Sequence, residues 1–571
     1  MTEAGRYGLI LAAIAAAVWI VRRAAARLLL SRAKHRSLAG HPRWARRLAR
    51  WLPAISYDEA QFFHADGAPE AVVACRRAAI DTLRRWHAER YPKSTVASRA
   101  MAQRVVDLEF TARYRVPFQF SAWLRTQLPA AAVLQASEGR WLVDLDGNHS
   151  LDLTGSYGVN LFGNEFYKQS MARGAELVAP LGAVLGSLHP VVDYNARRLC
   201  EISGLDAVSF HMSGTEAVMQ AVRLARYHTG RSRLVRFCGA YHGWWGDVQP
   251  GVGNPQVERD TFTLADLSPL ALRVLETRTD IACVLVNPLQ ALHPNSTAPA
   301  DSQLMVGARR AGFDRAAYAA WLQQLREVCT RRGIVLIMDE VMMGFRLGIG
   351  GAQEYFGMRA DLVTYGKSLG GGLPVGVLCG RRELMQRFRE DRPADICFAR
   401  GTFNAHPHVM GAMHEFLRHL ETPGAQQLLA DADTLWSARA TDLNARLAAA
   451  GVPLRVAALG SVWTFLYEAP SRYHWMLQYY LRAEGLTLSW VGSGRAIFSL
   501  DYTGEEYAEV VRSILAAAQR MQEGGWWWSP PVADPRRALR RELARELIQV
   551  GWRAWSGSIS SPRKRWKGAR Q

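Results

Sequence analysis

Paired cysteines are missing from this 571-residue chain. Its seven cysteines are scattered, and no Cys-x-x-Cys pair occurs. That spacing argues against a zinc site or a disulfide scaffold and suits a reducing compartment. Internal repeats and low-complexity segments are also missing. The hydrophobic content of 49% and the charged content of 21% are ordinary for a globular core, and the length predicts about three or four domains.

Acidic residues are scarce at both ends of the chain. Residues 1–57 contain eleven Lys and Arg against one acid, and residues 535–571 contain eleven against two. The net charge of +19 therefore belongs to the two ends, and residues 58–534 have no net charge. The body therefore has no electrostatic footprint for nucleic acid, which is not an expected partner.

The N-terminal segment contains an apolar run without the pattern of a cleaved signal peptide. Residues 7–21 are uncharged, and ten basic residues follow between Arg22 and Arg50, whereas a signal peptide carries its positive charge first. The run is shorter than the ~20 residues that cross a bilayer, although snorkelling arginines could make up the difference. We expect a single-pass or interfacial anchor, with a buried or surface helix as the alternative. The positive-inside tendency predicts a body that faces the cytoplasm.

Two further segments combine basic and aromatic residues. Residues 43–52 place Arg and Trp at helical spacing, which is typical of a helix on an anionic leaflet. Residues 535–555 predict a basic helix with leucines on one face. The tryptophans of this end suit a membrane interface and are Trp526, Trp527, Trp528, Trp552, Trp555 and Trp566. Packing of the helix on the body or on a partner subunit is an equal alternative.

Strand-like and helix-like segments alternate between the two ends. Buried-strand candidates lie at 205–211, 234–237, 281–286 and 334–338. The chain between them is long enough for crossover helices, which predicts an α/β fold with a mostly parallel central sheet covered by helices. A smaller α+β domain follows. The predicted division is an anchor at 1–57, an N-terminal segment and linker at 58–135, a large domain at 136–414, a small domain at 415–524 and a tail at 525–571.

Two neighbouring motifs predict a phosphate cup and an aromatic platform. Ser213, Gly214 and Thr215 follow a predicted strand and open a helix. A helix N-terminus with free N–H groups favours phosphate binding. Tyr241 and His242 come after the next strand, where an aromatic ring could stack on a cofactor ring.

Three later residues complete an ordered set. Asp339 ends the apolar run 334–338, Lys367 lies in the glycine-rich run 361–374, and Thr402 follows. A lysine amine can capture a carbonyl as a Schiff base, and a buried carboxylate can hold a ring nitrogen protonated. The whole set therefore predicts a pyridoxal phosphate (PLP) enzyme.

These motifs resemble those of the class III PLP-dependent aminotransferases of fold type I. That group includes the ω-aminotransferases and glutamate-1-semialdehyde aminomutase. The matching stretches are 144–148, 152–158, 213–217, 225–231, 241–243, 339–346 and 365–374, within a similarity that spans roughly 110–520. The resemblance implies PLP as cofactor and a homodimer with active sites at the subunit interface.

The resemblance also assigns roles to single residues. Lys367 would form the Schiff base and then move the substrate proton, and Asp339 would pair with the pyridine nitrogen. Tyr241 would stack on the ring, with Val341 packing on its other face. For His242, a structural role is at least as well supported as a catalytic one.

The phosphate and the substrate complete the site that the resemblance implies. Gly214 and Thr215, next to Ser213, would hold the phosphate, and Thr402 would reach it from the partner subunit. Ser156 and Tyr157 match a substrate-facing segment.

Finer features resemble the aminotransferase domains of polyketide and lipopeptide synthases, which aminate a carbonyl on a fatty-acyl chain. These features are Gln290 and the stretches 350–354, 364–367 and 401–407. One departure is Asn287-Pro288, where the family usually has Glu-Pro. We expect a membrane-associated transaminase that acts on a long-chain or carrier-bound aldehyde or ketone. The alternatives are a 2,1-aminomutase of the glutamate-1-semialdehyde kind and a catalytically silent membrane scaffold.

Overall fold

Two compact units make up the chain in the computed structural model, which describes residues 3–35, 41–51, 55–129, 133–249, 260–293, 313–488 and 494–555. Unit 1 combines 1–45, 166–298 and 312–433, and unit 2 combines 46–165, 299–311 and 434–571. Unit 2 thus joins residues that the sequence division placed in the N-terminal segment, the large domain and the small domain.

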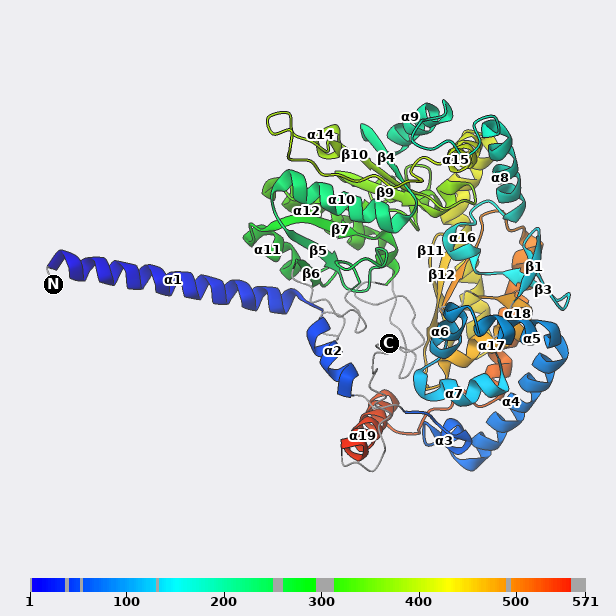
Figure 1. Ribbon diagram of the computed structural model, residues 1–571. Coiled ribbons are helices and arrows are strands. Elements are labelled where there is room, and N and C mark those ends of the chain that lie inside the picture. Colours follow the sequence, from blue (N-terminus) through cyan, green and yellow to red (C-terminus); the bar gives the residue numbers. More distant parts are fainter. Residues whose placement is uncertain are drawn as a thin grey trace, which may run out of the picture. The chain divides into compact units, whose positions relative to one another are not determined.

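Unit 1 is built on a seven-stranded sheet with the order β4-β10-β9-β8-β7-β5-β6 (Figure 1). The strands are β4 (Ala207–His211), β5 (Arg233–Phe237), β6 (Thr261–Leu264), β7 (Ile281–Val286), β8 (Val335–Asp339), β9 (Leu362–Gly366) and β10 (Gly376–Gly380). β10 is antiparallel to both neighbours, and the pairs from β9 to β6 are parallel. Every residue of β7, β8 and β9 is buried, which explains their apolar runs. The predicted α/β fold with a mostly parallel sheet is confirmed.

Helices surround this sheet. They are α8 (Asn164–Val178), α9 (Val191–Ser203), α10 (Gly214–Thr229), α11 (Pro269–Thr277), α12 (Arg315–Arg332), α13 (Gly351–Tyr355), α14 (Arg382–Met385) and α15 (Pro407–His419). A further helix, α16 (Pro423–Ala449), begins in unit 1 and ends in unit 2. α10 packs on β7 to β10 with a face of small apolar residues, among them Ala217, Ala221 and Ala225. This close packing fixes where the N-terminus of α10 lies.

Unit 2 contains two smaller sheets. One has the order β1-β2-β3-β13, with β1 (Leu134–Glu138), β2 (Trp141–Asp144), β3 (His149–Asp152) and β13 (Leu486–Thr487). The other joins β11 (Leu454–Leu459), β12 (Val462–Tyr467) and β14 (Arg495–Ile497). Its helices are α3 (Glu59–His64), α4 (Glu70–Arg90), α5 (Pro92–Ala102), α6 (Val106–Tyr114), α7 (Phe118–Gln127), α17 (Leu477–Ala483), α18 (Gly504–Glu523) and α19 (Pro535–Trp555).

An aromatic cluster packs the N-terminal helices of unit 2 against its C-terminal residues. Trp526 is fully buried, and its Nε1 donates to Tyr480 Oη at 2.7 Å. The guanidinium of Arg76 lies 5.7 Å from the Trp526 ring and forms a bidentate pair with Asp66, with both side chains fully buried. Trp527 is also buried. The expectation that these tryptophans face a membrane is therefore wrong for both, because they complete a protein core.

The C-terminal helix α19 packs on unit 2 along its first half. Leu539 is fully buried, and Glu546 Oε2 accepts from buried Arg472 at 3.3 Å. The first half of α19 therefore packs on the body, which was one of the two alternatives for this helix. Trp552, near its end, is 66% exposed. Trp566 and the side chain of Trp555 lie outside the described residues.

The N-terminal helix α1 (Glu3–Ala33) belongs to unit 1, and a short helix, α2 (Pro42–Trp51), follows it. In the described part of the chain, no helix has the length and apolar character needed to cross a membrane. The expected single-pass span is thus unsupported.

Candidate active site

The first turn of α10 begins among closely packed glycines. Ser213 caps the helix, and its Oγ accepts a hydrogen bond from Glu216 N at 3.3 Å. A Cβ at Gly214 would lie 2.7 Å from Val341 Cγ1, and one at Gly376 would lie 1.9 Å from the Ser213 carbonyl oxygen. Because no larger residue fits there, Val341 and β10 pack directly against the first turn of this 16-residue helix, whose positive end favours an anion.

The loop that carries the aromatic motif lies against the same turn. Gly243 has a φ of +89°, and a Cβ there would lie 2.5 Å from Thr215 Oγ1. The structure therefore brings the predicted phosphate cup and the Tyr241-His242-Gly243 motif together, although 25 residues of helix and strand intervene.

A buried histidine–carboxylate pair lies at the end of β8. His242 Nδ1 is 2.8 Å from Asp339 Oδ2, and both side chains are almost completely inaccessible. Burial lowers the pKa of His242, so the ring is neutral, and because a carboxylate only accepts, Nδ1 carries the proton. Asp339 Oδ1 accepts from Val341 N at 3.2 Å and from Thr364 Oγ1 at 3.4 Å. These donors hold Asp339 in one orientation, which gives His242 a positioning role.

Lys367 follows β9 and opens a short 3-10 helix. Its φ of 49° is in the left-handed region, which non-glycine residues seldom occupy outside constrained sites. Its Nζ lies 3.1 Å from Met342 Sδ. β8 and β9 are adjacent and parallel, so Asp339 and Lys367 lie at the same carboxyl edge of the sheet, where α/β proteins bind their ligands. Val341 packs between Gly214 and Gly366 at this edge.

The carboxyl group next to Asp339 has a different environment. Glu340 is buried, and its two oxygens accept from Ala352 N at 2.7 Å and Gln353 N at 3.3 Å. Burial raises the pKa of Glu340 to about 8. Glu340 therefore fixes the start of α13.

A neutral amide stands beside Tyr241. Asn287 Nδ2 donates to the Tyr241 carbonyl oxygen at 2.8 Å, and Asn287 Oδ1 accepts from Leu289 N at 3.0 Å. Gln290 Nε2 donates to Cys238 O at 2.7 Å. The residues after β7 therefore support the loop after β5 at Cys238 and Tyr241. The Tyr241 side chain itself is 63% exposed, so its stacking role stays a prediction.

Thr402 lies on an exposed loop before α15. It lines a surface cavity together with Leu188, Arg387 and Arg400, all from unit 1. Its expected contact with the cofactor of a partner subunit stays a prediction.

Ser156 and Tyr157 belong to unit 2, where they form a left-handed turn. Their φ values are 46° and 57°, and both flanking glycines, Gly155 and Gly158, also have positive φ. A Cβ at Gly155 would lie 2.7 Å from the carbonyl oxygen of Ile497, so the turn is packed tightly against β14. Such backbone is retained where the surroundings impose it, often at functional sites.

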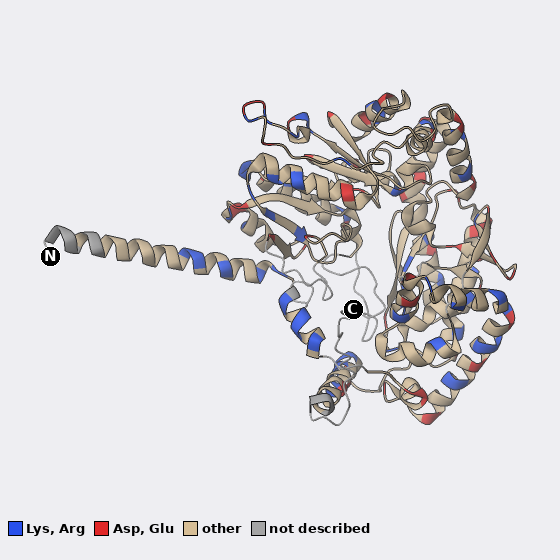
Figure 2. Ribbon diagram, viewed as in Figure 1, with Lys and Arg blue, Asp and Glu red and all other residues tan. Residues whose placement is uncertain are grey.

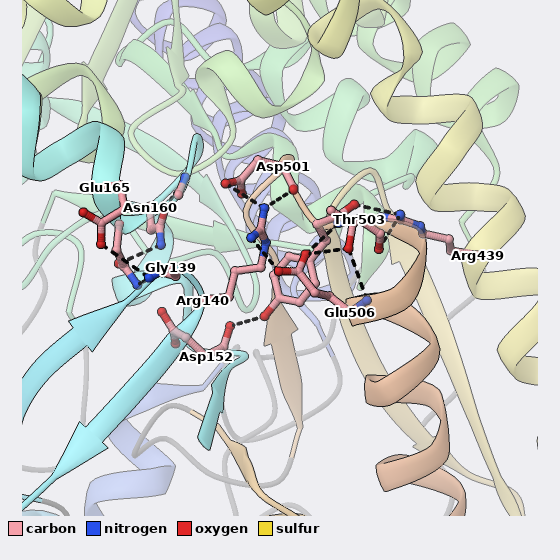
Figure 3. A network of polar contacts seen from close by, with 12 residues as sticks. Gly139, Arg140, Asp152, Asn160, Glu165, Arg439, Asp501, Thr503 and Glu506 are labelled. Carbon is pink, nitrogen blue, oxygen red and sulfur yellow. Dashed lines mark hydrogen bonds and ion pairs between the residues drawn. The ribbon is translucent and has the colours of Figure 1, made fainter. Parts of the chain in front are cut away.

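A polar network supports the segment around this turn (Figure 3). Arg140 Nη1 donates to Glu506 Oε1 at 2.6 Å, and its Nη2 is 3.0 Å from Asp501 Oδ2. Tyr502 Oη donates to Asp152 O at 2.9 Å, three residues before Gly155. The network ties the start of the turn to the loop before α18.

The residues at this edge of unit 1 fit PLP. The glycines around α10 allow close packing at a helix N-terminus that favours a phosphate, the oriented carboxylate of Asp339 suits a protonated ring nitrogen, and Lys367 supplies the amine. When bound, PLP supplies the electron sink that lets a proton and an amino group move at a substrate carbon. Sequence reasoning did not find the contacts that Met342 makes with Lys367 and Thr364 makes with Asp339. It also did not find the close approaches at Gly243 and Gly376, for which the glycines themselves were the only signal.

Comparison with known proteins gives the same assignment. Residues 124–517 match the family model of class III aminotransferases. A glutamate-1-semialdehyde 2,1-aminomutase from Citrifermentans bemidjiense is 32% identical over 365 residues, which cover 60% of this chain and 78% of that protein. A solved transaminase with PLP bound is 27% identical, with a TM-score of 0.60 over 75% of this chain and 99% of the other. A β-phenylalanine aminotransferase from Variovorax paradoxus is 25% identical, with a TM-score of 0.63 over 78% and 98%.

The chain belongs to the class III aminotransferase family. It is a PLP-dependent transaminase of fold type I, as the motifs predicted.

Proposed function

We propose that the enzyme transfers an amino group from a small amino donor to an aldehyde or ketone on a long-chain or carrier-bound acyl substrate. The observation that carries amino transfer is the grouping in unit 1 of Lys367, the His242–Asp339 pair and the N-terminus of α10. Lys367 supplies a primary amine that can bind carbonyl groups and exchange a proton. The pair keeps a carboxylate oriented, and the helix end attracts an anion.

Apolar surface next to the site supports an apolar acceptor. Trp244, on the loop that carries Tyr241 and His242, is 75% exposed. Asn287 supports this loop with a neutral amide, so the position where the family usually has glutamate brings no charge. Exposed aromatic surface beside a reactive group favours an acyl chain over a small charged acceptor.

The test compares acceptors of different chain length in detergent, with one amino donor and with Lys367→Ala as the blank. Long-chain aldehydes and ketones should give higher kcat/KM than short soluble ones. Equal or better turnover of the short acceptors would contradict the long-chain assignment while leaving amino transfer intact.

A 2,1-aminomutase remains the second candidate, because the relative from Citrifermentans bemidjiense carries that name. An aminomutase moves the amine within one molecule and needs no external donor. If a keto acid forms from the amino donor at the same rate as the aminated acceptor, the enzyme is a transaminase. Product formed from an amino-aldehyde alone supports the aminomutase.

We also infer a homodimer. Four exposed apolar side chains share the cavity of Thr402: Leu188, Phe388, Ile396 and Phe398. An exposed patch of this kind marks an interface, and a second copy would place Thr402 at its neighbour's site. Mixing Lys367→Ala subunits with Thr402→Ala subunits should restore part of the activity, since the mixed dimer has one intact site. No recovery on mixing would contradict a shared site.

A further inference from the structure

We propose that the N-terminal helices attach the enzyme to an anionic lipid surface without crossing it. α1 is held at one end only in the described structure. Ala33 is fully buried, its carbonyl oxygen accepts from Ala265 N at 2.9 Å, and this end of α1 packs near α11. The inference does not depend on which carbonyl the enzyme aminates.

The other half of α1 presents apolar side chains to its surroundings. Residues 10–25 are exposed throughout. Leu11 is 68% exposed, Trp19 58% and Val21 66%. No residue from 7 to 21 is charged, so this part of α1 is apolar on every side. A helix of this kind needs an apolar environment, whereas a partner helix would cover one side only.

The arginines that follow the uncharged part of α1 indicate that its apolar environment is a lipid surface with negative charge. Arg22, Arg23, Arg27 and Arg32 follow the uncharged run, and no acid occurs between Glu3 and Asp58. Figure 2 shows this change along α1, from uncharged residues to arginines near the body. The Arg23 guanidinium lies 4.8 Å from the Trp19 ring, an arrangement that suits the headgroup layer.

α2 repeats the pattern in a form suited to lying flat. Trp44, Leu48 and Trp51 follow one face and are 60%, 41% and 79% exposed. Arg43 and Arg47 are exposed as well. Basic residues with an aromatic apolar face are typical of helices that bind anionic leaflets.

The length of the apolar half sets the depth of insertion. The uncharged run of α1 from residue 7 to 21 measures about 22 Å at ~1.5 Å per residue, less than the ~30 Å hydrocarbon core. The helix is therefore too short to cross the core but longer than the ~15 Å of one leaflet's share, so it enters one leaflet at a tilt while its arginines stay with the phosphates. The anionic leaflet is normally the cytoplasmic one, so the catalytic body lies on that side.

The test is co-sedimentation of the full-length holoenzyme with phosphatidylcholine vesicles, with and without phosphatidylserine. The wild type should bind the phosphatidylserine vesicles, and added salt should weaken binding. Leu11→Glu/Ile14→Glu in α1 and Arg43→Glu/Arg47→Glu in α2 should each weaken binding by at least about tenfold. Val106→Glu/Phe110→Glu in exposed helix α6 is the matched control and should bind normally.

Each other outcome overturns the proposal. Wild-type protein that stays in the supernatant with both vesicles shows that no lipid surface is bound. Equal binding of all variants shows that the two helices are not the contact. Loss of self-association in the α1 variant, without vesicle binding by the wild type, shows that a second copy covers α1. The amino-donor half-reaction, measured without vesicles, confirms that each variant is folded and loaded.

Discussion

Replacement of His242 tests whether this residue positions Asp339. In His242→Phe the ring is retained but the donor to Asp339 Oδ2 is lost. In His242→Asn the side-chain amide can donate from nearly the place of Nδ1. The 2.8 Å bond joins a neutral donor to a buried carboxylate, and such bonds contribute about 1.5–3 kcal/mol. We therefore expect the rate of the donor half-reaction to fall by about 10- to 100-fold in His242→Phe and much less in His242→Asn.

Rescue by the conservative variant separates positioning from a merely structural role. His242→Asn restores a donor to Asp339 Oδ2, so it should recover most of the rate that His242→Phe loses. Stopped-flow measurement of the half-reaction gives both rates. Equal rates for the two variants would refute the positioning role.

Three further predictions concern stability. Asp66→Ala leaves the buried Arg76 without its carboxylate partner and should lower the free energy of unfolding by about 3–5 kcal/mol. Glu109→Ala, in an exposed ion pair, should lower it by less than about 1 kcal/mol. Equal losses for the two variants in urea unfolding would contradict the importance of the buried pair. Gly376→Ala places a methyl group 1.9 Å from the Ser213 carbonyl oxygen. It should lower the free energy of unfolding by at least about 1–3 kcal/mol and weaken PLP binding. Unchanged PLP binding in a titration would contradict a role of this close packing in positioning the N-terminus of α10. The folded pKa of Glu340 is about 8, against 4.5 for the free group. The unfolded state therefore loses its proton first, and the free energy of unfolding falls as the pH rises between these values. Glu340→Gln should remove that fall, and parallel wild-type and variant curves at pH 5 to 8 would contradict it.

Local patterns were sufficient to predict the sheet and the order of the cofactor motifs. Buried strands such as β7 and β8 are continuous apolar runs. Asp339 ends β8 and Lys367 directly follows β9, and the ends of these two strands meet at one edge. The start of α10 was predictable because a cap residue and a glycine precede a helical pattern.

Long-range packing decided what the sequence left open. An indole suits both a membrane interface and an aromatic core, and Trp526 is in a core because Tyr480 and Arg76 surround it. The bond between His242 and Asp339 joins residues 97 positions apart, so only the fold could select a positioning role. The residues that pack against the glycines of the site are likewise distant in sequence, as Val341 is from Gly214 and Ser213 is from Gly376.

The most direct test of the enzyme's chemistry is the reaction of Lys367→Ala with an amino donor. The purified wild type should show the visible absorbance of lysine-bound PLP and convert the donor to its keto acid when a carbonyl acceptor is present. Lys367→Ala should lack that absorbance and form keto acid only at the background rate, while remaining folded by circular dichroism. Keto-acid formation by the folded variant at the wild-type rate would contradict the assignment of Lys367 and of the active site built around it.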